Sequence, residues 1–86
     1  MKAYIGKFGC DKTWQQKFPE ETVCVYCGGK ARIGFVAYEG HGEPEYVCHL
    51  HENDPGGSGY WLHDACAVAV YFCRKCLKPT ALYNQA

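Results

Sequence analysis

Apolar and polar side chains alternate most clearly over residues 31–39, where Phe35 and its neighbours two positions away are apolar. This period of two predicts a β-strand. The Gly-rich run 40–44 predicts a turn, and residues 45–51 are a second strand candidate that would pair with the first as a hairpin. A further short strand is expected over residues 4–8.

The stretch 63–72 is rich in alanine, the best helix former, and Asp64 favours the beginning of a helix. Val68 and Val70 oppose it, because β-branched side chains lose χ1 freedom in helices. We expect a short helix here, with Pro79 preventing any continuation. The predicted fold class is therefore a small α+β domain with a β-hairpin and one short helix. Two Cys-x-x-Cys pairs, at residues 24–27 and 73–76, predict two zinc knuckles that stabilise it.

A chain of 86 residues predicts a single domain, divided into an N-terminal segment (1–22), a zinc-binding core (23–78) and a tail (79–86). Its hydrophobic core is too small to stabilise the fold without a metal, disulfides or a partner. Nine basic and nine acidic side chains cancel, so the strong positive field of nucleic-acid-binding proteins is missing. No leader or membrane segment is recognisable. We expect a cytoplasmic protein without a membrane partner, whose cysteines are reduced and bind metal.

The same short spacing occurs in four Cys/His pairs, each with two residues between its members. One tight turn can then aim both side chains at a single tetrahedral ion. Four pairs suffice for two closed sites, so we expect two structural zinc ions. The eight predicted ligands are Cys24, Cys27, Cys48, His51, His63, Cys66, Cys73 and Cys76.

Some of these assignments leave alternatives. In a regular strand Cys48 and His51 would point to opposite faces, so the pair requires a turn or bulge. His49 is a competing ligand for His51, and Cys66 could instead be a small buried residue. Cys10 has no partner at a suitable spacing and is interpreted as a spare thiol.

The ligand order resembles that of the cross-brace zinc domains, the RING and PHD fingers, and segment 61–66 looks like the PHD pattern of an aromatic, a His and a Cys. The resemblance implies that the first and third pairs share one zinc and the second and fourth the other. The two implied sets are Cys24, Cys27, His63 and Cys66, and Cys48, His51, Cys73 and Cys76. In a nested alternative, the two Cys-x-x-Cys knuckles form a zinc ribbon and the mixed pairs close an inserted loop.

Closed sites supply folding energy and no open coordination position, so the expected function is a non-catalytic protein-interaction or adaptor module. A rubredoxin-like electron carrier would use the two Cys-x-x-Cys knuckles for iron. Resemblance to zinc-braced HNH endonucleases implies His49 as a general base, and a ubiquitin ligase is the other enzymatic alternative. Nucleic-acid binding would use interleaved basic and aromatic residues, namely Lys12, Trp14, Lys17, Arg74, Lys75 and Lys78.

Overall fold

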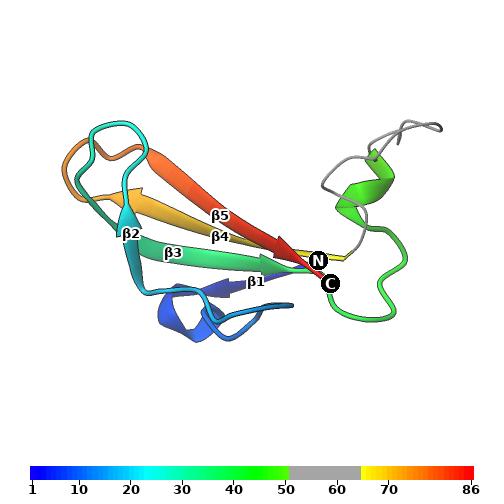
Figure 1. Cartoon of the computed structure of the whole chain (residues 1–86). Coiled ribbons are helices and arrows are strands. Elements are labelled where there is room, and N and C mark those ends of the chain that lie inside the picture. Colours follow the sequence, from blue (N-terminus) through cyan, green and yellow to red (C-terminus); the bar gives the residue numbers. More distant parts are fainter. Residues whose placement is uncertain (51–64) are drawn as a thin grey trace.

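A computed structural model describes residues 1–50 and 65–86, which form an antiparallel β-sheet (Figure 1). Within this part of the chain the sheet has five strands, in the order β1-β3-β4-β5, and β2 pairs with the beginning of β3. Two 3-10 turns, η1 and η2, complete the regular structure. The elements are β1 (Lys2–Ile5), η1 (Gly6–Gly9), β2 (Glu21–Val23), β3 (Lys30–Tyr38), η2 (Val47–Leu50), β4 (Cys66–Cys73) and β5 (Pro79–Gln85).

The predicted α+β class is wrong, because the described residues contain no α-helix and are mostly β. Most of the stretch predicted as a helix is strand β4, which pairs with β3 on one side and β5 on the other. Val68, Val70 and the aromatic residues after them favour a strand. Pairing with two strands stabilises this segment by more free energy than the helix propensity of its alanines could contribute. Residues 63 and 64 lie outside the described part.

Strand β3 confirms the prediction for residues 31–39, but its predicted hairpin partner is wrong. Residues 47–50 form η2, and β3 pairs with β4, with Ala31 opposite Cys73. Local hydrogen bonds turn the chain instead. The His49 amide donates to the Tyr46 carbonyl (2.9 Å), and the Val47 amide donates to the Glu39 carboxylate (3.2 Å). These amides are therefore not available to a sheet.

The core lies on one face of the sheet, under the N-terminal segment. The Tyr71 hydroxyl donates to the Pro19 carbonyl (2.6 Å), and the Phe18 amide donates to the Cys10 carbonyl (2.9 Å). These bonds hold the N-terminal segment across β4. The buried core comprises Cys10, Phe18, Cys24, Ala31, Val36, Ala67, Ala69, Tyr71 and Cys73.

The two chain ends lie side by side at one end of the sheet, and the loops with the Cys-x-x-Cys knuckles lie at the other (Figure 1). Residues 79–85, which the sequence placed in a tail, are strand β5. The Asn84 side chain accepts a hydrogen bond from the Trp14 amide (3.1 Å), so β5 is also tied to the N-terminal segment. Within residues 1–50 and 65–86 no helix has the length and hydropathy needed to cross a membrane.

Gly9 is a point of close approach that yields a test of this packing. A Cβ there would lie 2.8 Å from the Tyr4 carbonyl oxygen and from the Val36 side chain. We expect Gly9→Ala to destabilise the fold by about 1–3 kcal/mol through overpacking. Gly40→Ala is the control, because its nearest neighbour would be Tyr38 at an ordinary 3.6 Å. Urea denaturation measures both, and equal stabilities would contradict this packing.

Candidate metal centre

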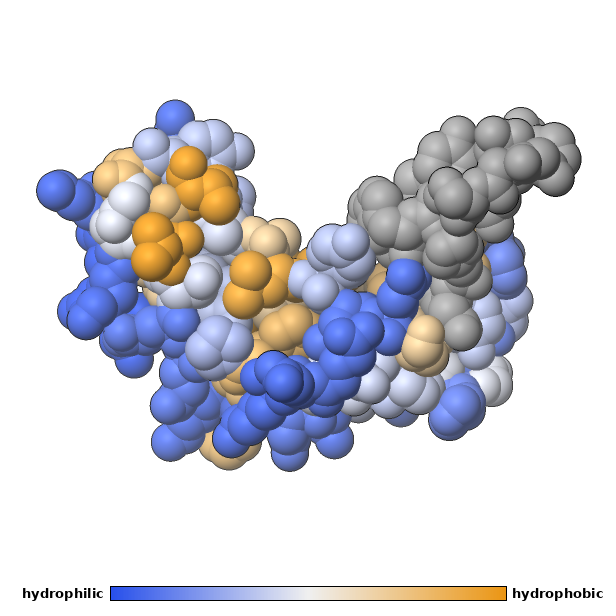
Figure 2. Space-filling model, viewed as in Figure 1, coloured by the Kyte–Doolittle hydropathy of each residue, from blue (hydrophilic) through white to orange (hydrophobic). Residues whose placement is uncertain are grey.

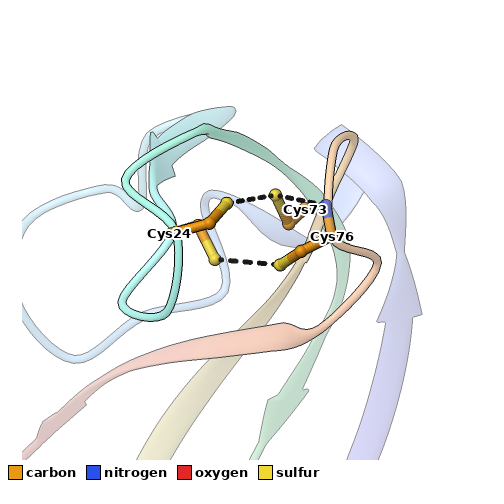
Figure 3. A group of neighbouring side chains, drawn as sticks. Cys24, Cys73 and Cys76 are labelled. Atoms are coloured by element: carbon orange, nitrogen blue, oxygen red, sulfur yellow. Dashed lines mark hydrogen bonds between the residues drawn. The ribbon is translucent and has the colours of Figure 1, made fainter.

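Four cysteines from two distant parts of the chain meet at one end of the sheet. Cys24 and Cys27 lie in the loop between β2 and β3, Cys73 ends β4, and Cys76 lies in the turn before β5. Their sulfur atoms all lie within 4.8 Å of one another. Figure 3 shows Cys24, Cys73 and Cys76 directed toward one another from the two loops. The β3–β4 register produces this meeting, because it sets Ala31, shortly after the first knuckle, opposite Cys73.

The sulfur–sulfur distances suit a tetrahedral metal ion. The Sγ atoms of Cys24 and Cys76 are 3.6 Å apart, and those of Cys27 and Cys73 are 3.5 Å apart. Metal–sulfur bonds of about 2.3 Å give a tetrahedron with edges of about 3.8 Å. A disulfide would need about 2.05 Å, and all four thiols are free. The residues present therefore fit a four-sulfur metal site.

The two knuckles have the same backbone geometry. In the first, the Gly28 amide donates to the Cys24 carbonyl (3.0 Å) and the Cys24 amide donates to Gly29 (2.8 Å). In the second, the Leu77 amide donates to the Cys73 carbonyl and the Cys73 amide donates to the Lys78 carbonyl, both at 3.1 Å. The residue after the second cysteine has a positive φ in each, 74° at Gly28 and 65° at Leu77. The two sequences therefore form one kind of turn twice.

Backbone amides also point at the sulfur atoms. Tyr26 donates to the Cys24 sulfur and Gly29 to the Cys27 sulfur, both at 3.4 Å. The Cys73 sulfur accepts from Lys75 (3.3 Å) and from Cys76 (3.4 Å). Such bonds favour the thiolate form and tune a bound metal.

The pKa values within the cluster diverge. Amides of Cys76 and Lys75 lower the pKa of Cys73 to about 6, and the Cys27 amide lowers the pKa of Cys24. The Lys78 amide lowers the pKa of Cys76, but burial and three neighbouring thiol groups raise it by more. The result is a pKa raised to about 11. Crowded sulfur atoms cannot all be thiolates without a compensating positive charge. A cation bound among them would supply that charge.

Two of the remaining predicted ligands, Cys48 and Cys66, do not join this cluster. Cys48 lies half-buried in η2, and Cys66 is fully buried on β4. His51 and His63 lie outside the described residues, so the second site stays a prediction. The grouping of the two Cys-x-x-Cys knuckles is that of the zinc-ribbon alternative, and it differs from the pairing that the cross-brace resemblance implied for Cys24 and Cys27.

The competing residues are also accounted for. His49 lies in η2, exposed, and its Nδ1 accepts a hydrogen bond from the Tyr46 amide (3.2 Å). Cys10 is a buried core residue whose thiol donates to the Pro19 carbonyl (3.8 Å). Burial raises the pKa of Cys10, which suits a neutral thiol in the core. Among the described residues, neither side chain belongs to a ligand cluster.

Glu39 is a residue whose importance the sequence analysis missed. It belongs by sequence to an acidic stretch, but it is only 1% exposed. Its carboxylate accepts hydrogen bonds from the Cys66 thiol (2.8 Å) and the Val47 amide (3.2 Å). Burial, together with the Glu39 carboxylate, raises the pKa of Cys66 to about 12. Its position two residues after Ala37, in phase with the strand alternation, was the available signal.

Comparisons with protein-family models, with curated proteins and with solved structures find no match for this chain. The interpretation of the cysteine cluster therefore depends on its own geometry and chemistry.

The duplicated knuckle turn gives a matched pair of substitutions. Gly28→Ala should destabilise the fold by about 1–2 kcal/mol, because a left-handed φ is unfavourable for a residue with a Cβ. Nothing lies within 4 Å of that Cβ, so the cost is conformational. The exposed Leu77, which already bears this strain, should be replaceable by glycine with a change within about 1 kcal/mol. Chemical denaturation checks both. A neutral Gly28→Ala would contradict the left-handed turn at this position.

The Cys66 thiol should resist alkylation in the folded protein. Only a thiolate reacts, and a buried thiol with a pKa of about 12 is protonated at pH 8. Iodoacetamide labelling followed by peptide mass mapping should leave Cys66 unmodified in native protein. In denaturing urea with a chelator, all seven cysteines should react. Fast native labelling of Cys66 would contradict its buried bond to Glu39.

Proposed function

We propose that the four-cysteine cluster is a structural zinc site of the zinc-ribbon type, in a non-catalytic binding module. The observation that carries this proposal is the approach of four sulfur atoms to within 4.8 Å from two matching knuckles. An all-sulfur tetrahedral site is typical of structural zinc or of iron. With four protein ligands no coordination position stays open for a substrate, so the site stabilises the fold and does no chemistry.

The thin core supports a structural role for the metal. The core is a single layer between one sheet face and the N-terminal segment, and two of its members, Cys24 and Cys73, are also ligands of the proposed site. Zinc would join the β2–β3 loop to the β4–β5 turn at the end of the sheet. Binding free energies of about 10–16 kcal/mol for structural zinc exceed the net stability of most small domains.

The surface around the site supports a protein as the partner. Val25, Tyr26 and Leu77 are exposed apolar residues on the two knuckles. Nucleic-acid binding by base stacking is less well supported here. The Lys78 ammonium lies over the Tyr26 ring, 4.9 Å from its centre, and Trp14 is half-buried against Tyr38. Aliphatic side chains beside a covered ring suit protein contacts better than stacked bases.

A second zinc ion remains part of the proposal. It would use Cys48 and Cys66 together with the predicted histidines, His51 and His63. Zinc binding would require the Cys66 thiol to lose the proton that it now donates to Glu39. We therefore separate the two sites experimentally, with one variant directed at each.

Metal analysis tests the proposal directly. Purified protein should contain zinc, and complete removal by a chelator should abolish the fold, as circular dichroism would show. Cys27→Ser should weaken zinc binding by more than about 100-fold, since even the loss of a group that only hydrogen-bonds to a metal ligand costs about 10–100-fold. Tyr26→Ser, between the same two ligands, is the control and should keep the metal. Cys48→Ser should reduce a content of two ions to one.

Two outcomes would contradict the proposal. A metal-free chain that keeps its fold would exclude a structural role for zinc. Retention of full zinc affinity in Cys27→Ser would exclude the cysteine cluster as the site. Iron as the purified metal, with a red colour, would favour instead the electron carrier, the second function that an all-sulfur site admits.

A further inference from the structure

Strand β4 has apolar side chains on both of its faces. Its sequence from Cys66 to Cys73 contains no charged residue. Ala67, Ala69 and Tyr71 point into the core, so the residues between them point to the opposite side of the sheet. A continuous apolar strand is typical of sheets that are covered on both faces, whereas a solvated face normally carries polar residues.

Strand register shows that neighbouring strands continue this apolar character across the sheet. Val70 lies opposite Phe35 on one side and Ala81 on the other, and Ile5 lies opposite Phe35. Paired residues of antiparallel strands share a face. We call this surface the outer face. Its exposed or half-buried members are Ala3, Ile5, Phe35, Ala37, Val68, Val70, Phe72, Ala81 and Tyr83, with Arg32 and Pro79 at its knuckle end. At its other end the face continues to Glu39 and Cys66, which are buried where Val47 of η2 donates a hydrogen bond to Glu39, so we do not count them as part of the outer face.

Large side chains of the outer face are exposed. Ile5 is 73% exposed and Phe72 is 46% exposed. The Phe72 ring lies over Gly34, where a Cβ would collide with it, and its centre is 6.5 Å from that of Phe35. Figure 2 shows hydrophobic surface in the middle of the molecule as well as at the knuckle end. A contiguous apolar surface of this kind marks an interaction site.

We propose that a second copy of this chain covers the outer face, so that two sheets pack face to face in a homodimer. The outer face is about seven residues long on β3, β4 and β5 and four residues long on β1. Its flat area is therefore roughly 400 Å² at the usual strand spacing and rise. Two copies, with the relief of their side chains, bury about 1,000 Å² or more in total, the size at which a specific interface becomes stable.

Charge does not oppose a second copy. Both ends of the sheet carry both signs, because Glu21 lies opposite Arg32 at the knuckle end and Glu43 pairs with the Met1 ammonium (3.2 Å) at the other. The net charge is zero, so two copies do not repel one another as whole molecules. A neutral, flat and mainly apolar face can pack against a copy of itself across a two-fold axis.

Sedimentation equilibrium of the metal-loaded full chain, from about 1 to about 500 μM, tests the proposal. Native protein should be a dimer at the upper concentrations. Ile5→Lys buries two charges in the interface and should raise the dimer dissociation constant at least about tenfold. Phe8→Lys is the matched control, because Phe8 lies in η1, is 77% exposed and is not part of the outer face. It should leave the constant unchanged.

Phe72→Ser provides a second variant on β4, and zinc content and circular dichroism verify that each variant is folded. A monomer throughout the concentration range would overturn the proposal, and would leave the face to a different protein. A dimer equally weakened by Phe8→Lys, or unaffected by both outer-face variants, would also overturn it. Zinc content is measured separately, so failure of the dimer is distinguishable from failure of the metal site.

Discussion

The approach of Cys24 and Cys27 to Cys73 and Cys76 is the constraint on which the other features depend. The two knuckles are separated by about half of the chain, and the order of strands in the sheet brings them together. β3 follows the first knuckle and β4 runs into the second, so pairing of these two strands positions all four sulfur atoms. Conversely, a cation between the sulfur atoms would hold the β3–β4 register at that end. Strand pairing therefore determines where the sulfur atoms lie, and a bound cation would in turn stabilise the strand pairing.

The sequence predicts part of this arrangement well. The spacing within the two Cys-x-x-Cys knuckles identifies the residues that cluster, and the alternation in β3 identifies a strand. The sequence did not show which pairs come together in space, because spacing describes only the two cysteines of one knuckle. Strand pairing over long range decides their grouping, and it overruled the order of pairs that resembled the cross-brace domains. His51 and His63 lie outside the described residues, so their assignment stays a prediction.

Strand β4 and Glu39 show why other features of the structure could not be predicted from the sequence. Ala67 and Ala69 raise helix propensity in isolation, but in the structure they are small because they pack beneath the N-terminal segment. Local propensity differs from residue to residue by less than about 1 kcal/mol, so pairing with two strands outweighs it. Glu39 has the charge of a surface residue, and only its partners, the Cys66 thiol and the Val47 amide, explain its burial.

Cys73 has a double position that bears on how the protein unfolds. It is the last residue of the central strand, 1% exposed in the core, and its sulfur lies in the cluster. Disturbing that sulfur disturbs the same backbone that pairs with β3 and β5. We therefore expect the sheet and the cysteine cluster to open as one cooperative unit, in the sense used for hydrogen exchange. The amides of β4 would then lose their protection together with the cysteine cluster rather than in a separate step.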